Sequence, residues 1–181
     1  MIYVFLANGF EEIEALAPVD FLLRAGVEVK TVGVSGKLCR GAHGIGVEAD
    51  ILPEDVVLDE GVEGIILPGG MPGAENLNNS PDVQKAIDFC AENGKIISAI
   101  CAAPFILGRK GLLEGKNATC FPGFEDELKG ASVLEKGVVT DGNIVTARGA
   151  GVAWEFGAAI CSIMMGEEKA LQILRGIQWR K

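Results

Sequence analysis

Cys101 is the residue whose position in this sequence most directly indicates chemistry. It ends the apolar, strand-like run 95–100 and is followed by Ala102-Ala103-Pro104, which is compatible with the start of a helix. A nucleophile between a strand and a helix stands above the sheet edge, with backbone N–H groups directed at it. We therefore predict a nucleophile elbow with cysteine in place of serine, and a thiol pKa below its ordinary value of about 8.5. A buried structural cysteine is the alternative that this spacing leaves open.

Three glutamates open the helix that is expected after the first strand. Acidic residues at a helix N-terminus suit the helix dipole, which accounts for Glu11, Glu12 and Glu14 without any chemistry. Helix geometry separates them, because Glu14 lies one turn beyond Glu11 whereas Glu12 points elsewhere. If Glu14 enters a crevice, burial keeps its carboxyl group protonated, so that it can donate a hydrogen bond to the Cys101 sulfur. Glu14 is therefore our candidate general acid or base.

Two glycines, Gly69 and Gly70, follow the apolar run 64–67. Glycine permits a close approach of the backbone to a ligand, so this turn is a candidate substrate-binding segment. The N–H group of Gly70, together with that of Ala102, could form an oxyanion hole for an attacked carbonyl group. A tight turn without further function is the alternative. No Lys-Ser or Lys-Thr pair follows, which argues against a nucleotide phosphate loop.

His43 is the only histidine, and it lies in the glycine-rich loop from Arg40 to Gly44. We expect either an exposed loop side chain or a residue that lines the substrate site, in the same chain or from a partner subunit. One histidine and widely spaced cysteines do not suggest a metal site, so no metal and no cofactor are predicted. An odd number of cysteines is typical of free thiols in a reducing compartment. The five cysteines are Cys39, Cys90, Cys101, Cys120 and Cys161.

The order of the apolar segments predicts the framework that must position these residues. Strands and helices alternate along one domain of residues 1–181, which favours an α/β fold with a mostly parallel sheet and helices on both faces. Because carboxyl ends of parallel strands share one edge of the sheet, we expect Glu14, Gly70 and Cys101 to converge there. The expected strands are 2–7, 27–32, 64–67 and 95–100, with an edge strand or hairpin at 44–50 and a hairpin at 138–146. The expected helices are 11–24, 81–92, 151–165 and 168–178.

Composition and charge narrow the classes of partner. The net charge of -9 argues against non-specific nucleic-acid binding and against attraction to anionic membranes. The first strand lacks the basic flank and the length of a secretory signal. The apolar stretch 149–166 is interrupted by Glu155 and is too short to span a bilayer. We expect a soluble, cytoplasmic protein that binds neither nucleic acid nor membranes.

Four segments together resemble the signature blocks of the ThiJ/PfpI superfamily, and most closely its branch of the Parkinsonism-associated deglycase, the DJ-1-like branch. They occur in order along nearly the whole chain: Gly9-Phe10-Glu11-Glu12-Ile13-Glu14, Leu67-Pro68-Gly69-Gly70-Met71-Pro72-Gly73-Ala74, Ala99-Ile100-Cys101-Ala102-Ala103-Pro104 and Thr146-Ala147-Arg148-Gly149-Ala150-Gly151. The resemblance implies a flavodoxin-like three-layer sandwich and a homodimer. It also implies that Cys101 is a strained, oxidation-prone nucleophile, that Glu14 is its protonated partner, and that Gly70 and Ala102 supply the oxyanion donors.

Two departures from that family pattern narrow the expected activity. Phe121 precedes Pro122 where several relatives carry a histidine, and Ala102 stands where protease-like relatives have one. Both argue against peptidase or amidotransferase chemistry. The resemblance then implies a cofactor-independent enzyme that acts on small reactive carbonyls, either as a glyoxalase that converts methylglyoxal to lactate or as a deglycase of glycated substrates. The alternative is a redox-responsive protein or chaperone that senses peroxide through oxidation of Cys101.

Overall fold

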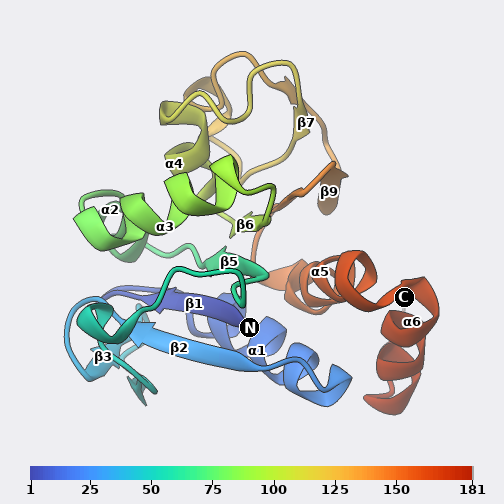
Figure 1. The fold of residues 1–181 in the computed structure, drawn as a ribbon. Coiled ribbons are helices and arrows are strands. Elements are labelled where there is room, and N and C mark those ends of the chain that lie inside the picture. The colour runs from blue at the N-terminus through green and yellow to red at the C-terminus, as the bar shows by residue number, and fades with distance from the viewer. Residues whose placement is uncertain (181) are drawn as a thin grey trace.

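A six-stranded sheet forms the centre of the computed structural model, which describes residues 1–180 (Figure 1). Its strand order is β2-β1-β5-β6-β10-β9, and all neighbours are parallel except the pair β9 and β10. Taken in chain order, the five parallel strands follow the 2-1-3-4-5 order of flavodoxin-like folds. The strands are β1 (Ile2–Leu6), β2 (Val29–Gly33), β5 (Gly64–Leu67), β6 (Ile96–Ile100), β9 (Val138–Asp141) and β10 (Ile144–Ala147).

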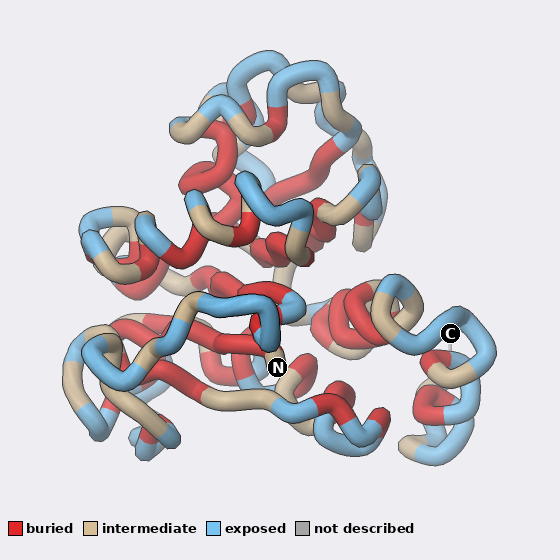
Figure 2. The backbone as a smooth tube through the Cα atoms, viewed as in Figure 1, coloured by how far each residue is buried: buried red, intermediate tan, exposed pale blue. Residues whose placement is uncertain are grey.

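Helices cover both faces of this sheet. Alternate side chains of a strand point to opposite faces, so Phe5 of β1 faces one helix layer while Val4 faces the other. The first layer consists of α2 (Gly73–Asn78), α3 (Pro81–Glu92) and α4 (Pro104–Arg109). The second consists of α1 (Glu12–Ala25), α5 (Ala153–Met165) and α6 (Glu167–Gly176). Figure 2 shows the buried backbone concentrated in the sheet and along the helices that face it. The predicted three-layer α/β sandwich is therefore confirmed.

Short elements lie outside the main sheet. β3 (Leu38–Arg40) pairs with β4 (Gly46–Glu48) in an antiparallel ribbon, so the edge strand expected at 44–50 has a partner that the sequence pattern did not indicate. β7 (Asn117–Ala118) pairs with β8 (Ser132–Val133). Three 3-10 turns cover Pro53–Asp55, Glu125–Glu127 and Ala150–Val152. The last of them delays the start of α5 to Ala153, two residues after the expected position.

Local sequence signals account well for the longest elements. Ser80 caps α3 by accepting a hydrogen bond from the Val83 N–H group at 3.4 Å. At the end of α1, Gly26 adopts a φ of 84°, which a glycine tolerates and most residues do not. No helix among residues 1–180 combines the length and the apolar character needed to cross a membrane.

The loops after β1, β5 and β6 all begin at the same edge of the sheet, because these three strands are parallel neighbours. Glu11 at the start of α1 donates its N–H group to the Gly69 carbonyl oxygen at 3.0 Å, which ties the first two loops together. The strand order changes direction at β1, and crevices at such points are where open α/β sheets bind ligands.

Candidate functional site

Cys101 occupies the turn between β6 and α4 in a strained backbone conformation. Its φ is 65°, and Gln178 is the only other non-glycine residue with a positive φ among residues 1–180. The Cys101 N–H group donates to the Ala147 carbonyl oxygen at 2.8 Å, and the Phe121 N–H group donates to the Cys101 carbonyl oxygen at 2.8 Å. A left-handed conformation of this kind costs about 1–3 kcal/mol, so the surrounding structure must hold it in place. The sharp strand-to-helix turn predicted at Cys101 is present, and its side chain is half-buried.

Glu14 reaches this cysteine from the first turn of α1. Its side chain is 1% exposed, and its carboxyl group lies close enough to the Cys101 thiol to shift the pKa of both groups. The carboxylate also accepts the N–H group of Gly69 at 3.0 Å and that of Ala150. The structure therefore brings together Cys101 and Glu14, the two side chains that we predicted to interact. The backbone N–H groups of Gly69 and Ala150 hold the carboxyl group in place.

The protonation of this pair differs from the sequence-based expectation. Burial raises the pKa of Glu14 from 4.5 to about 7, and the nearby charge of Glu11 adds to that effect. Burial, followed by the charge and hydrogen bond of Glu14, raises the pKa of the Cys101 thiol to about 12. The prediction of a depressed cysteine pKa is therefore wrong in direction. Hydrogen bonds from the Gly70 and Ala102 N–H groups lower the pKa of Cys101, but they do not outweigh burial beside a carboxylate. Near neutral pH the site holds a thiol next to a carboxyl group that is ready to accept its proton.

Both predicted oxyanion donors lie at the sulfur. The N–H groups of Gly70 and Ala102 act on the Cys101 thiol, where they lower its pKa. Gly70 has a φ of 83°, a conformation that favours glycine. Gly69 is needed for a different reason, since a Cβ atom there would lie 2.6 Å from the Cys101 Cβ and 2.6 Å from the Glu14 Oε2. Gly69 thus makes room for the contact between Cys101 and Glu14.

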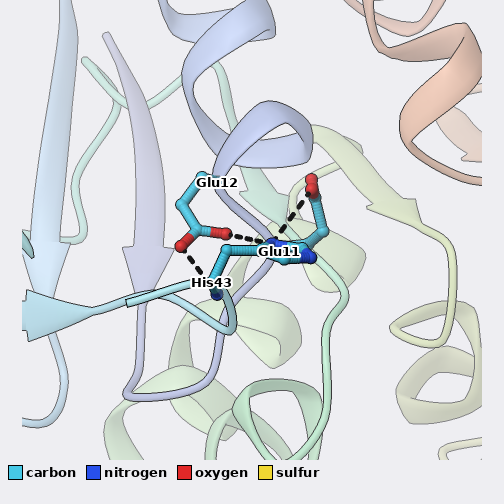
Figure 3. Close-up of side chains that lie close together, drawn as sticks. All are labelled: Glu11, Glu12 and His43. Carbon is cyan, nitrogen blue, oxygen red and sulfur yellow. Dashed lines mark hydrogen bonds and ion pairs between the residues drawn. The ribbon is translucent and has the colours of Figure 1, made fainter. Parts of the chain in front are cut away.

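His43 lies elsewhere. Its imidazole Nδ1 is 2.8 Å from Glu12 Oε2 and 3.9 Å from Glu11 Oε1, and its side chain is 69% exposed (Figure 3). The hydrogen bond to Glu12 raises the pKa of His43. Burial alone would raise the pKa of Glu12, but its hydrogen bonds with His43 and the backbone hold it below the ordinary value. Within residues 1–180, no hydrogen bond or ion pair connects His43 to Cys101 or Glu14. The structure therefore shows the exposed loop histidine, one of the two alternatives.

Among residues 1–180, the group formed by Glu11, Glu12 and His43 is also the one that could hold a metal ion, because its ligand atoms lie within 4.8 Å of one another. Hydrogen bonds explain the same arrangement without an ion. Glu12 accepts the backbone N–H groups of His43 at 2.9 Å and Ile45 at 3.3 Å. Glu11 caps α1 by accepting the Glu14 N–H group at 2.7 Å. The group fastens the loop around His43 to the start of α1, as Figure 3 shows for Glu12 and His43.

A surface hollow beside the reactive pair was not foreseen from the sequence. Its volume is about 420 Å³, and it is lined by Phe121, Pro122, Arg148, Gly149, Ala150, Gly151 and Val152. The side chain of Phe121 is 47% exposed. Ala150, which donates to Glu14, was also missed as a site residue. The only available signal was the segment 146–151, which carried a family resemblance but no side chain of obvious chemistry.

Comparisons with known proteins agree along the whole chain. The family model described as the DJ-1/PfpI family matches residues 1–163. Protein DJ-1 homolog B of Arabidopsis thaliana is 39% identical over 171 residues, which cover 93% of this chain and 39% of that protein, so the chain spans about two fifths of that relative's length. The glutathione-independent glyoxalase DJR-1.2 of Caenorhabditis elegans is 31% identical over 167 residues, which cover 91% of this chain and 88% of that protein. The structure of oxidised Toxoplasma gondii DJ-1 superimposes with a TM-score of 0.94 at 34% identity, covering 99% of this chain and 98% of that one.

Proposed function

Because this chain belongs to the DJ-1/PfpI family, we propose that it is a cysteine enzyme that converts methylglyoxal and similar small 2-oxoaldehydes into 2-hydroxy acids without a cofactor. One observation carries the proposal: the buried Glu14 carboxyl group, with a pKa of about 7, lies beside the Cys101 thiol. A carboxyl group whose pKa is near the working pH is suited to accept and return protons. The relative from Caenorhabditis elegans, named as a glutathione-independent glyoxalase, supports this substrate class. Early adducts of the same aldehydes with amines or thiols are further candidate substrates.

The first step is the addition of Cys101 to the aldehyde. Glu14 accepts the thiol proton while the sulfur forms a bond to the aldehyde carbon, and it then returns that proton to the aldehyde oxygen, which completes a hemithioacetal and leaves Glu14 ionised. This use of Glu14 as a base follows from the raised pKa of Cys101, which leaves little thiolate at neutral pH. The N–H groups of Gly70 and Ala102, which act on the sulfur, would stabilise the negative charge that develops on the oxygen.

The second step moves hydrogen between the two carbons of the substrate. Glu14 removes the proton from the former aldehyde carbon and returns it to the adjacent ketone carbon, while the hydroxyl proton of the first carbon passes to the ketone oxygen. The first carbon is thereby oxidised to a thioester and the second is reduced to an alcohol, so that no external oxidant or reductant is needed. Water then cleaves the thioester, which releases the hydroxy acid and restores the Cys101 thiol.

Lactate formation from methylglyoxal tests this proposal. We expect the purified protein to produce lactate, and we expect both Cys101→Ser and Glu14→Gln to abolish it. Cys161→Ala and Glu54→Gln are matched controls, because Cys161 lies within α5 and Glu54 is exposed in a 3-10 turn, both outside the site. Full turnover by either site variant would refute the mechanism, provided that thermal unfolding shows all four variants folded.

A redox-responsive protein or chaperone that acts through Cys101 is the second candidate, and the oxidised state of the Toxoplasma relative favours it. Peroxide reacts with the thiolate. Since the pKa of Cys101 is raised, the thiolate is scarce near neutral pH, so oxidation, like addition to a carbonyl, depends on transfer of the thiol proton to Glu14. Intact mass after mild peroxide treatment separates the two functions. Selective gain of two oxygen atoms at Cys101, with negligible lactate formation, would favour the sensor.

We also propose that the protein is a homodimer that pairs through α1. An apolar hollow of about 330 Å³ is lined there by Glu12, Ile13, Leu16, Ala17, Ile45 and Trp154. Ile13 is 54% exposed and Ile45 is 56% exposed, which is costly for apolar side chains unless a second copy covers them. Sedimentation velocity should show a dimer that Ile13→Glu dissociates and Leu171→Glu, on α6, leaves intact. A monomeric native protein would refute the dimer.

A further inference from the structure

The hollow lined by Phe121 lies next to the reactive pair. We propose that it is a subsite for the substituent of the 2-oxoaldehyde, and that the protein therefore prefers substrates with an aryl or other bulky apolar group over methylglyoxal. This inference rests on the proposed function and concerns the part of the substrate that does not react. Its ligand is an apolar group attached to the ketone carbon, with phenylglyoxal as the simplest aromatic example.

Gly149 provides the connection between the hollow and the reactive pair. The position that a Cβ atom would take at Gly149 is 3.5 Å from the Phe121 ring and 3.8 Å from the Glu14 Oε1. A ligand atom beside Gly149 is thus within contact distance of both the ring and the carboxylate. The Phe121 N–H group also donates to the Cys101 carbonyl oxygen at 2.8 Å, which fixes the backbone of Phe121 relative to the nucleophile. A substrate whose carbonyl groups face Cys101 and Glu14 can therefore place its substituent in the hollow.

The chemistry of the lining selects an apolar group. Phe121, Pro122, Ala150 and Val152 present carbon atoms, and the glycines at 149 and 151 present none beyond the backbone. Arg148 is the only charged residue of the lining, and it also borders a second hollow that contains Cys120. Its positive charge acts on Cys120, where it lowers the thiol pKa against the larger effect of burial. Arg148 thus borders both hollows. The other residues that line the hollow beside Glu14 carry no charge, and their side chains are apolar.

The size of the hollow agrees with a large substituent. Its volume of about 420 Å³ lies within the range of about 300–1,000 Å³ that is typical of pockets for drug-sized ligands. The methyl group of methylglyoxal leaves most of that space to water. A phenyl group can instead pack against the Phe121 ring, an arrangement that aromatic pairs favour beyond the burial of area alone. The reaction is otherwise unchanged: phenylglyoxal and one water give mandelate, with the aldehyde carbon oxidised and the ketone carbon reduced.

The ratio of kcat/KM for phenylglyoxal to that for methylglyoxal tests the subsite. We expect Phe121→Ala to lower this ratio about tenfold, because the ring contact is lost for one substrate and matters little to the other. Phe121→Tyr, which keeps the ring, should retain the ratio. Leu171→Ala is the matched control, since Leu171 is 46% exposed and lies on α6, away from the hollow. 4-Carboxyphenylglyoxal serves as a third substrate, and a preference for it over both others would show that Arg148 selects an acid and would overturn the proposal.

A binding measurement tests the subsite even if the protein turns over no aldehyde. Acetophenone and acetone are compared as protecting ligands while iodoacetamide alkylates Cys101, and alkylation is followed by intact mass. We expect acetophenone to protect at about one tenth of the acetone concentration, and Phe121→Ala to remove this advantage. Equal protection by the two ketones, or a substrate ratio that Phe121→Ala leaves unchanged, would overturn the subsite. Absence of turnover with selective protection by acetophenone would instead refute the proposed function and leave the subsite supported.

Discussion

Replacement of Glu14 by glutamine should stabilise the fold by an amount that grows with pH. The ordinary pKa of a glutamate is 4.5, and burial raises that of Glu14 to about 7 in the folded protein. Between these two values the folded state binds more protons than the unfolded state, so the native protein loses stability as the pH rises. At about 1.4 kcal/mol per pH unit, a difference of about 2.5 corresponds to about 3 kcal/mol. Glutamine carries no ionising group and should escape this loss.

Urea unfolding between pH 4.5 and pH 8, under reducing conditions, measures the effect. We expect the free energy of unfolding of Glu14→Gln, relative to the native protein, to rise by about 3 kcal/mol across this range. Any constant change in hydrogen bonding with Gly69 or Ala150 cancels in this comparison, because only the pH dependence is read. The cysteine thiols do not interfere, since their raised pKa values affect stability only at higher pH. Glu54→Gln is the control that should follow the native curve. If the curves for Glu14→Gln and the native protein are parallel, folding does not raise the pKa of Glu14, and the reasoning is refuted.

Three further outcomes follow from the same contacts. With methylglyoxal, kcat/KM should rise as the pH increases through about 7, because Glu14 acts as the base in its ionised form; a rate that is flat from pH 5 to pH 8 would contradict this role. Gly69→Ala should lower kcat/KM more than tenfold, because its Cβ would lie 2.6 Å from the Cys101 Cβ, whereas Gly176→Ala meets nothing within 4 Å and should have no such effect. Glu12→Ala should lower the free energy of unfolding by about 1–3 kcal/mol in urea titrations, because it leaves the N–H groups of His43 and Ile45 unpaired. His43→Ala should cost less, since the imidazole is exposed, and an equal loss for both variants would count against this account of the loop.

The framework of the site could be predicted because its signals are local. Short apolar runs define β5, which Pro68 follows, and β6, which Cys101 follows, and the parallel order then brings their carboxyl ends to one edge. Helix periodicity was enough to separate Glu14 from Glu12, and the structure places Glu14 at Cys101 and Glu12 at the loop of His43. Each of these inferences needed only neighbours along the chain and the topology of the sheet.

What could not be predicted depends on contacts between distant segments. The pKa of Cys101 is set by how deeply the thiol is buried and by the charge of Glu14, and a sequence indicates neither. The N–H group of Ala150 and the hollow beside Phe121 were missed for the same reason. Both depend on residues 148–152, which follow β10 and lie against Glu14 of α1 and against Phe121. The strand β3 escaped prediction because three residues are too few to show an alternating pattern.

Intact mass of the Glu14→Gln protein during reaction with methylglyoxal tests the central claim most directly. Without the Glu14 charge the pKa of the Cys101 thiol is lower, so the thiol still adds to the aldehyde, slowly and without a base. No group is then left to move the proton between the substrate carbons. We therefore expect one equivalent of methylglyoxal to accumulate on Cys101, located by peptide mapping, while no lactate forms. Lactate formation by this variant, or an adduct on another cysteine with Cys101 unmodified, would contradict the account.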